Sequence, residues 1–238
     1  VENTYRDVNV ALANEISLIC EKYGIDVEEL IKVCNSHPRV HLLKPGPGVG
    51  GPCLPKDPYL LLSPQGIPQI SSKLILESRK INDQMPSHVV NLIAESLAAQ
   101  NKDPKNSSVL ILGVAYKANV SDTRFSPAKQ IVTELIDLGS KVHVYDPFTS
   151  ETFGGEPVSD IWSIMPHVDV LSIVTDHDEF KKLDLMRIKK IMKQIPIVVD
   201  TRRIFTRKNA EEIGINYIAV GYNKKTQKKF KKIETGNT

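Results

Sequence analysis

The sequence predicts a helical N-terminal part followed by a doubly wound parallel sheet. Apolar residues recur at helical spacing in the first part of the chain, as Leu12 and Ile19 illustrate. From Val109 onward, short apolar runs alternate with helical segments, which is typical of a parallel sheet. A polar stretch from Gln100 to Ser108 separates the two patterns. We therefore expect two domains, at residues 1–103 and 104–238.

The composition argues against several classes of protein. The 238 residues carry a net charge of +3, which is too small to indicate nucleic-acid binding. No apolar run is long enough to span a membrane, and no signal peptide opens the chain. Cys20, Cys34 and Cys53 form no CxxC pair, so we expect a reducing, cytoplasmic environment without a disulfide framework or a bound metal. A solvated C-terminal tail is predicted by Lys224, Lys225, Lys228, Lys229, Lys231 and Lys232.

Two helices are expected at the start of the chain. The first runs from Val1 to about Tyr23 and ends at Gly24, a residue that commonly terminates helices. The second begins after Asp26, which forms a capping box with Glu29, and it reaches about Cys34. The chain opens with a valine inside a helical pattern that has no cap. We therefore expect a fragment of a longer protein, produced by truncation or proteolysis.

A glycine-rich stretch that leads to Cys53 is the most distinctive part of the sequence. Its glycines let the backbone approach a ligand and leave amides free to donate. We expect a helix to begin near Leu54, with Pro55 in its first turn. Cys53 would then lie at a helix N-terminus beside Lys56, and both features favour a thiolate. Asp57 would lie one turn further on and face the same site. The alternative is a buried structural cysteine after a turn.

Further helices are expected from Pro58 to about Gln100. A new helix is predicted to start at Pro86 and to end near Ala99. The residues expected to break the preceding pattern are Pro64, Gly66 and Pro68.

The second half of the chain is expected to supply the sheet. A helix from about Ser126 to Leu138 ends at Gly139. The expected strands are Val109–Val114, Lys141–Tyr145, Val168–Val174, Ile197–Asp200 and Ile215–Val220.

The first strand of this sheet opens like a Rossmann-like dinucleotide fold, but Gly113 stands alone where the GxGxxG motif needs three glycines. We therefore do not expect NAD to bind there. Ligands of such sheets bind at the carboxyl ends of the strands. The candidates at that edge are Tyr116 and Lys117, and the Asp200–Arg203 segment. The alternative for each of these residues and for the Asp122–Pro127 segment is a helix cap or a surface ion pair, and this alternative fits Asp122 and Ser126 best.

The string GPGVGGPCLPKD resembles the active-site loop of the UDP-glucose/GDP-mannose dehydrogenase family, in the form seen in its UDP-N-acetylmannosamine dehydrogenase branch. The resemblance continues in NTYRDVNVALANE, which starts at Asn3, and in GVAYKANVSDTRFSP, which starts at Gly113. It covers nearly the whole chain.

The resemblance implies an NAD-dependent, four-electron oxidation of a nucleotide sugar from alcohol to acid. Cys53 would be the nucleophile, Asp57 would position or deprotonate water, and Asn3 would help to hold the oxyanion and water. The family's catalytic lysine and its NAD-binding domain would both lie before Val1. We therefore expect this chain to be inactive alone.

The resemblance also implies substrate contacts and a homodimer formed through the helical domain. The D-x-R-x-S-P match places Arg124 near the cofactor diphosphate. The spacing from Arg39 to Cys53 is slightly shorter than in UDP-glucose dehydrogenases, which fits the N-acetylmannosamine branch. The residues expected to bind the UDP-sugar are Asn3, Arg6, His37, Arg39, Gly50, Tyr116, Lys117 and Arg202.

Three alternatives remain open at this stage. Within the family, the chain could belong to a UDP-glucose or a GDP-mannose dehydrogenase. A cysteine hydrolase would need a histidine partner, and no histidine has a context that marks it as one. A non-catalytic dimer module that binds a nucleotide sugar would not require a Cys53 with a lowered pKa.

Overall fold

The computed structural model describes residues 1–63, 71–192 and 195–222. The described chain forms two compact units. Of the described residues, the helical unit comprises those within 1–85 together with 220–222, and the sheet unit comprises those within 86–219. The domain boundary expected after residue 103 stays a prediction. The predicted helix break at Pro64, Gly66 and Pro68 and the lysines of the C-terminal tail lie outside the described residues.

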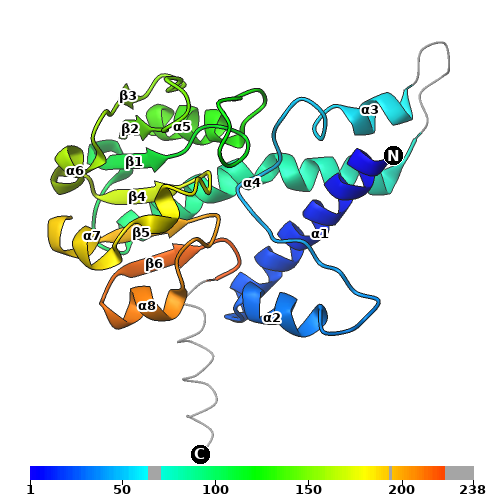
Figure 1. Ribbon diagram of the computed structural model, residues 1–238, viewed down its shortest axis with the longest axis horizontal. Helices are drawn as coiled ribbons and strands as arrows, with labels where there is room; N and C mark the ends of the chain where they lie inside the picture. The colour runs from blue at the N-terminus through cyan, green and yellow to red at the C-terminus, as the bar shows by residue number, and fades with distance from the viewer. Residues whose placement is uncertain (64–70, 193–194, 223–238) are drawn as a thin grey trace, which may run out of the picture. The chain divides into compact units, whose positions relative to one another are not determined.

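The helical unit contains α1 (Glu2–Tyr23), α2 (Val27–Cys34), α3 (Asp57–Leu62) and the first part of α4 (Lys73–Ala98), as Figure 1 shows. Helix α1 packs against α2 and α3. It ends at Gly24, which adopts the left-handed conformation (φ 67°) that was expected of a terminating glycine. Helix α2 begins after Asp26, whose side chain accepts a 3.0 Å hydrogen bond from the Glu28 amide.

Two expected helix starts are wrong. Helix α3 begins at Asp57 instead of Leu54, because the Pro58 ring in a helix running from Leu54 would clash with the carbonyl four residues back. Helix α4 runs unbroken through Pro86, where a new helix was expected. The missing hydrogen bond to the Asn82 carbonyl is tolerated there because the helix is buried around it, as Met85 and Val89 are.

The chain returns to the helical unit after the last strand, at Val220–Tyr222. The Gly221 amide donates to Glu21 Oε1 at 2.8 Å, and the Gly221 carbonyl accepts from the Val27 amide at 3.0 Å. Only glycine suits this position, since φ is 78° and a Cβ atom would lie 2.2 Å from Val27 Cγ1.

The sheet unit is built on a six-stranded, fully parallel sheet with strand order β3-β2-β1-β4-β5-β6. The sheet is parallel and doubly wound, as the alternation of strands and helices predicted, although the strand order itself was not predicted. The strands are β1 (Ser108–Leu112), β2 (Lys141–Tyr145), β3 (Glu156–Pro157), β4 (Val170–Ile173), β5 (Ile197–Asp200) and β6 (Asn216–Ala219). All five expected strands are present within a few residues of their predicted ends. The two-residue edge strand β3 was not expected.

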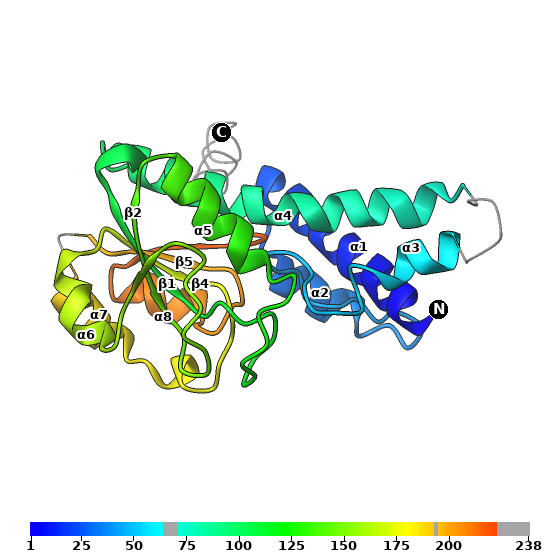
Figure 2. The same ribbon diagram turned by 90° about the horizontal axis from the view of Figure 1, so that it is seen from above.

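Helices cover both faces of this sheet. Figure 2 shows α5 (Pro127–Asp137) and the second half of α4 on one side, with α6 (Ile161–Ile164), α7 (Leu185–Ile191) and α8 (Arg207–Glu212) on the other. Ser87 on α4 donates a 2.7 Å hydrogen bond to Glu134 on α5. Ser126 caps α5, as expected, by accepting from the Ala128 amide. Strands β1, β4 and β5 are buried almost throughout and form the core. No helix within the described ranges is long and apolar enough to cross a membrane.

Candidate active site

The structure brings together three residues that the sequence singled out for catalysis. Asn3 lies on the first turn of α1, and its Nδ2 donates a 2.7 Å hydrogen bond to Asp57 Oδ2. Asp57 is the first residue of α3, and its amide donates to the Cys53 carbonyl at 2.8 Å. The Lys56 amide donates to the same carbonyl at 3.0 Å, which closes a turn. Cys53 is exposed, so the alternative of a buried structural cysteine does not hold.

A buried hydrogen-bond network holds the start of the glycine-rich loop. The Gly46 amide donates to Asn14 Oδ1 on α1 at 2.9 Å, and Asn14 Nδ2 donates to Asn82 Oδ1 on α4 at 2.9 Å. Asn82 Nδ2 in turn donates to Asp7 Oδ1 at 2.9 Å. Arg79 Nη1 completes the network with a 2.6 Å bond to the same Asp7 oxygen. The loop that leads to Cys53 is therefore anchored to both long helices at one buried point.

The charged end of this network is almost fully enclosed. The Asp7 side chain has no exposed surface and that of Arg79 is 3% exposed. Burial raises the pKa of Asp7 above its ordinary value, although the Arg79 guanidinium opposes the shift. Arg79 also pairs with Asp83 on the next turn of α4. Sequence reasoning missed this cluster, because Asp7 and Arg79 each look like ordinary polar positions of an amphipathic helix.

The remaining predicted residues of the helical unit lie at the surface. Arg6, His37 and Arg39 are exposed, and Gly50 is partly exposed. The Arg39 amide donates to His37 Nδ1 at 3.3 Å within the turn that follows α2. Within the described ranges, no hydrogen bond or ion pair joins Arg6, His37 or Arg39 to Cys53. Their role as substrate contacts stays a prediction.

In the sheet unit, the predicted binding residues lie at the carboxyl edge of the sheet, where ligands of such folds bind. Tyr116 and Lys117 follow β1, and Lys117 is exposed. Arg202 follows β5, and its Nε donates to Asp176 Oδ1 at 3.0 Å. Burial alone would raise the pKa of Asp176, but the Arg202 guanidinium, together with a backbone hydrogen bond and the charge of Lys181, holds it below its ordinary value.

The fully buried side chain of Asp200 accepts hydrogen bonds from the loop after β5. Asp200 Oδ1 accepts from the Arg202 amide at 3.2 Å, and Oδ2 accepts from the Phe205 amide at 3.0 Å. The Tyr217 hydroxyl donates to Asp200 Oδ2 at 3.1 Å. Burial raises the pKa of Asp200, with these hydrogen bonds acting in the opposite direction. The backbone that carries Arg202 is therefore tied to a buried carboxyl.

Arg124, the residue predicted to lie near the cofactor diphosphate, is engaged within its own loop. Its Nε and Nη2 donate to Asp122 Oδ1 and Oδ2 at 3.0 and 2.7 Å. The hydrogen bonds from Arg124 lower the pKa of Asp122 below its ordinary value. This is the surface ion pair weighed as the alternative for Asp122. The Arg124 side chain remains 66% exposed.

The residues around the β1 turn do not fit a dinucleotide. Gly113 is the lone glycine of the turn, and a Cβ atom added to it would lie 2.5 Å from Thr175 Cβ. Thr175 therefore packs directly against the Gly113 backbone, and the turn lacks the other two glycines of the GxGxxG motif. Within the described part of the chain, no cluster of three or more histidine, cysteine or acidic side chains could hold a metal ion.

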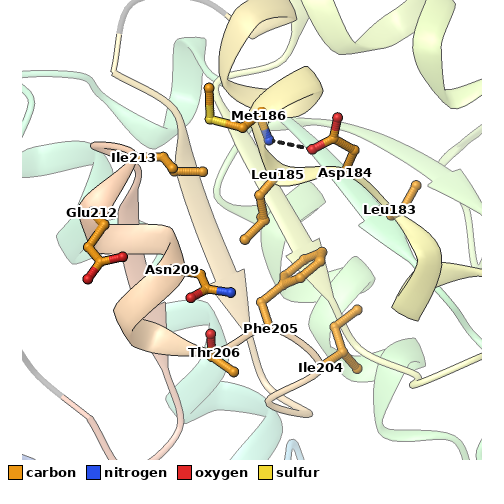
Figure 3. A pocket seen from close by; sticks show the side chains of 10 residues that line it. All are labelled: Leu183, Asp184, Leu185, Met186, Ile204, Phe205, Thr206, Asn209, Glu212 and Ile213. Atoms are coloured by element: carbon orange, nitrogen blue, oxygen red, sulfur yellow. Dashed lines mark hydrogen bonds between the residues drawn. The ribbon is translucent and has the colours of Figure 1, made fainter.

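A separate cavity of about 430 Å³ lies beside the sheet (Figure 3). It opens between the segment that enters α7 and the segment that enters α8. The predicted site residues are not part of its lining, which comprises Leu183, Asp184, Leu185, Met186, Ile204, Phe205, Thr206, Asn209, Glu212 and Ile213.

Comparison with known proteins identifies the family. Residues 1–84 match the central domain of the UDP-glucose/GDP-mannose dehydrogenase family, and residues 110–207 match its UDP binding domain. The UDP-N-acetyl-D-mannosamine dehydrogenase of Methanocaldococcus jannaschii is 41% identical over 93% of this chain and 50% of its own length.

Two solved structures are similar as well. The UDP-D-ManNAc dehydrogenase of Pyrococcus horikoshii has a TM-score of 0.82 and 38% identity, covering 92% of this chain and 50% of that one. The NDP-N-acetyl-D-galactosaminuronic acid dehydrogenase of Methanosarcina mazei has a TM-score of 0.84 and 28% identity, and the match covers 93% of this chain and 49% of that one. The chain spans about half the length of the curated relatives it matches. It belongs to the UDP-glucose/GDP-mannose dehydrogenase family.

Proposed function

We propose that the whole protein is an NAD-dependent dehydrogenase that oxidises UDP-N-acetyl-D-mannosamine to UDP-N-acetyl-D-mannosaminuronate in a four-electron reaction. The observation that carries this proposal is the contact between Asn3 and Asp57 at the turn that presents Cys53. The names of the relatives from Methanocaldococcus jannaschii and Pyrococcus horikoshii support the substrate.

Each residue of this group has a role that follows from its chemistry. The exposed Cys53 sulfur, on losing its proton, adds to the carbonyl carbon of the aldehyde intermediate, which prevents the aldehyde from escaping. Oxidation of that adduct leaves a thioester, which water must cleave. Asp57 has a second carboxylate oxygen that can accept a hydrogen bond from this water. Asn3 keeps one amide N–H that can donate to the developing oxyanion.

NAD is assigned to residues outside this chain, because the turn after β1 carries one glycine, packed against Thr175, where the GxGxxG motif has three. The sheet unit instead binds the nucleotide of the substrate. Lys117 and the Arg202 guanidinium at the carboxyl edge are charge-assisted donors suited to a diphosphate.

We include a homodimer formed through the helical unit. Helix α1 presents an apolar stripe to solvent at nearly heptad spacing, and buried helix–helix contacts commonly use that spacing. The members of this α1 stripe and their exposed fractions are Tyr5 (69%), Leu12 (44%), Ile19 (48%) and Tyr23 (60%).

The test is a panel of nucleotide sugars with NAD, in which NADH is followed on the protein with its preceding segment restored. Two NADH per UDP-N-acetylmannosamine, and little with other sugars, is the expected result. The chain alone and a Cys53→Ser variant of the longer protein are the controls, and neither should turn over.

Other outcomes of the panel have distinct meanings. Activity only with UDP-glucose, GDP-mannose or UDP-N-acetylgalactosamine would support a nucleotide-sugar dehydrogenase but contradict the proposed substrate. Absence of activity with every sugar would leave the chain as a module that binds nucleotide sugars without catalysing a reaction on them.

A further inference from the structure

Asp146 lies just beyond β2, where it joins the loops that follow three neighbouring strands. Its Oδ2 accepts from the Val114 amide at 2.8 Å and from the Ala115 amide at 3.1 Å, both in the loop after β1. The same oxygen is 3.1 Å from Nε2 of His177, which follows β4. Neither the Asp146 nor the His177 side chain has any exposed surface. Sequence reasoning singled out neither Asp146, which follows the expected strand Lys141–Tyr145, nor His177 as a site residue.

His177 forms a second tie to the same loop. Its Nδ1 accepts a 2.9 Å hydrogen bond from the Asn119 amide. Because Nδ1 is an acceptor, this network assigns the ring proton to Nε2, which donates to Asp146. The ring lies between Phe148 and Phe180, with centroid distances of 4.9 and 5.3 Å. Packing and hydrogen bonds therefore fix both the orientation and the tautomer of His177.

The loop between these two ties is short, and it carries the predicted diphosphate residues. Ala115 is held at its amide by Asp146 and at its carbonyl by the Thr175 hydroxyl, at 2.7 Å. Asn119 is held at its amide by His177 and at its side chain by Asp178, to which Nδ2 donates at 2.7 Å. Only residues 116–118 lie between these ends, and Lys117 is exposed among them.

Asp146 stays ionised in this buried setting. Burial alone would raise its pKa, but the hydrogen bonds from His177 and from the Phe148, Val114 and Ala115 amides outweigh burial and lower the pKa below its ordinary value. Without the His177 donor, the Val114, Ala115 and Phe148 amides would still hold the carboxylate, so this donor contributes less to the order of the loop than the His177 acceptor for the Asn119 amide.

We propose that Asp146 and His177 are a buried positioning pair that presets residues 116–118 for the diphosphate of a nucleotide ligand. This inference rests on the proposed nucleotide-sugar function. A loop that is already ordered loses less conformational entropy on binding, so presetting it raises affinity without adding a contact to the ligand. The pair acts through Tyr116 and Lys117 and does not itself touch the ligand.

The test separates the two hydrogen bonds of His177. A His177→Asn variant keeps an oxygen near the Nδ1 position, where it can accept from the Asn119 amide, and loses the donor to Asp146. A His177→Gln variant keeps a donor near Nε2 and loses the acceptor for Asn119. Exposed His41, in the helical unit, supplies the His41→Gln control. The readouts on the 238-residue chain are the affinity for UDP by calorimetry, amide hydrogen exchange across 115–119, and the melting temperature.

The expected result is a difference between two variants that are destabilised to a similar extent. His177→Gln weakens UDP binding about tenfold and speeds exchange at Asn119, whereas His177→Asn weakens binding by less than about threefold. Equal UDP affinities for the two variants, with lowered melting temperatures, would overturn the proposal and leave a purely structural pair.

Failure of the proposed function gives a different result. If the unaltered chain does not bind UDP, the diphosphate assignment falls together with the proposed function. Faster exchange at Asn119 in His177→Gln alone would still support the positioning of the loop by His177.

Discussion

Asn3 and Asp57 are 54 residues apart in the sequence, yet their side chains share a 2.7 Å hydrogen bond. The bond joins the first turn of α1 to the first residue of α3, and Asp57 also bonds through its amide to the Cys53 carbonyl. In the proposed mechanism, Asp57 orients the attacking water and Asn3 stabilises the oxyanion of the Cys53 adduct.

Replacing Asn3 by Ala should lower kcat about a hundredfold with little change in KM, because an oxyanion donor acts mainly in the transition state. The measurement is steady-state NADH formation by the protein with its preceding segment. Asn9→Ala is a matched control on the same helix, since the Asn9 side chain donates to the Tyr5 carbonyl one turn away. Equal loss in both variants would indicate a general effect on α1 and contradict the role of Asn3.

The three cysteines should react with iodoacetamide in the order of their exposure. Cys53 is exposed, Cys34 is partly buried and Cys20 is buried, so Cys53 should be labelled first and Cys20 last. Burial also raises the pKa of the Cys20 thiol, which lowers its thiolate fraction. Mass spectrometry of the labelled peptides over time checks this order. In the unfolded chain, the three cysteines should be labelled at similar rates. Labelling of Cys20 as fast as Cys53 in the folded chain would contradict the packing of α1.

The fold could be predicted from the sequence because its signals are local. Apolar runs and the glycines that end helices located the long elements, and the carboxyl edge followed from the parallel order. Strand β3 was not predicted because Glu156 and Pro157 form no apolar pattern. The unbroken course of α4 through Pro86 depends on burial that no local rule contains.

The candidate site could be predicted only in part, for a related reason. Cys53 and Asp57 are close in the sequence, and the family resemblance supplied Asn3. Asp7 and Arg79 pair across 72 residues, His177 and Asp146 pair across 31, and each of these residues has an ordinary sequence context. Such long-range polar contacts become visible only when the elements are packed.

The α1 stripe predicts a dimer that charged substitutions disrupt. Leu12→Glu and Ile19→Glu should each raise the dimer dissociation constant by at least about tenfold, because burying a Leu or Ile side chain contributes roughly 1.5–3 kcal/mol. Sedimentation velocity over a range of concentrations measures this constant. Ile195→Glu is the control, since Ile195 is 59% exposed in the sheet unit. If the unaltered chain were monomeric, or if neither α1 variant weakened the dimer, the α1 stripe would not be the dimer interface.

Replacing Arg79 by Met should destabilise the protein by roughly 3–5 kcal/mol, because Asp7 would be left as a buried charge without its guanidinium partner. Urea unfolding measures the loss. Lys80→Met is the matched control, since Lys80 is the next residue of α4 and its side chain is 64% exposed. Its effect should stay within about 0.5 kcal/mol. A double variant that also carries Asp7→Asn should recover part of the lost unfolding free energy. If the double variant were as unstable as Arg79→Met alone, the charge of Asp7 would not be the cause of the destabilisation.

The pH dependence of the Arg79→Met variant gives an independent check on the same charge. Burial raises the pKa of Asp7 in the folded protein above its ordinary value of 3.8, and removing Arg79 takes away the group that opposes this rise. The folded state then binds a proton more readily than the unfolded chain. The destabilisation caused by the unpaired Asp7 carboxylate is therefore largest at pH values above the raised pKa, and it becomes smaller as the pH falls toward 3.8. The difference in unfolding free energy between the variant and the unaltered chain should accordingly narrow on acidification, and a difference that stayed constant or widened would mean that Asp7 is not the destabilising charge.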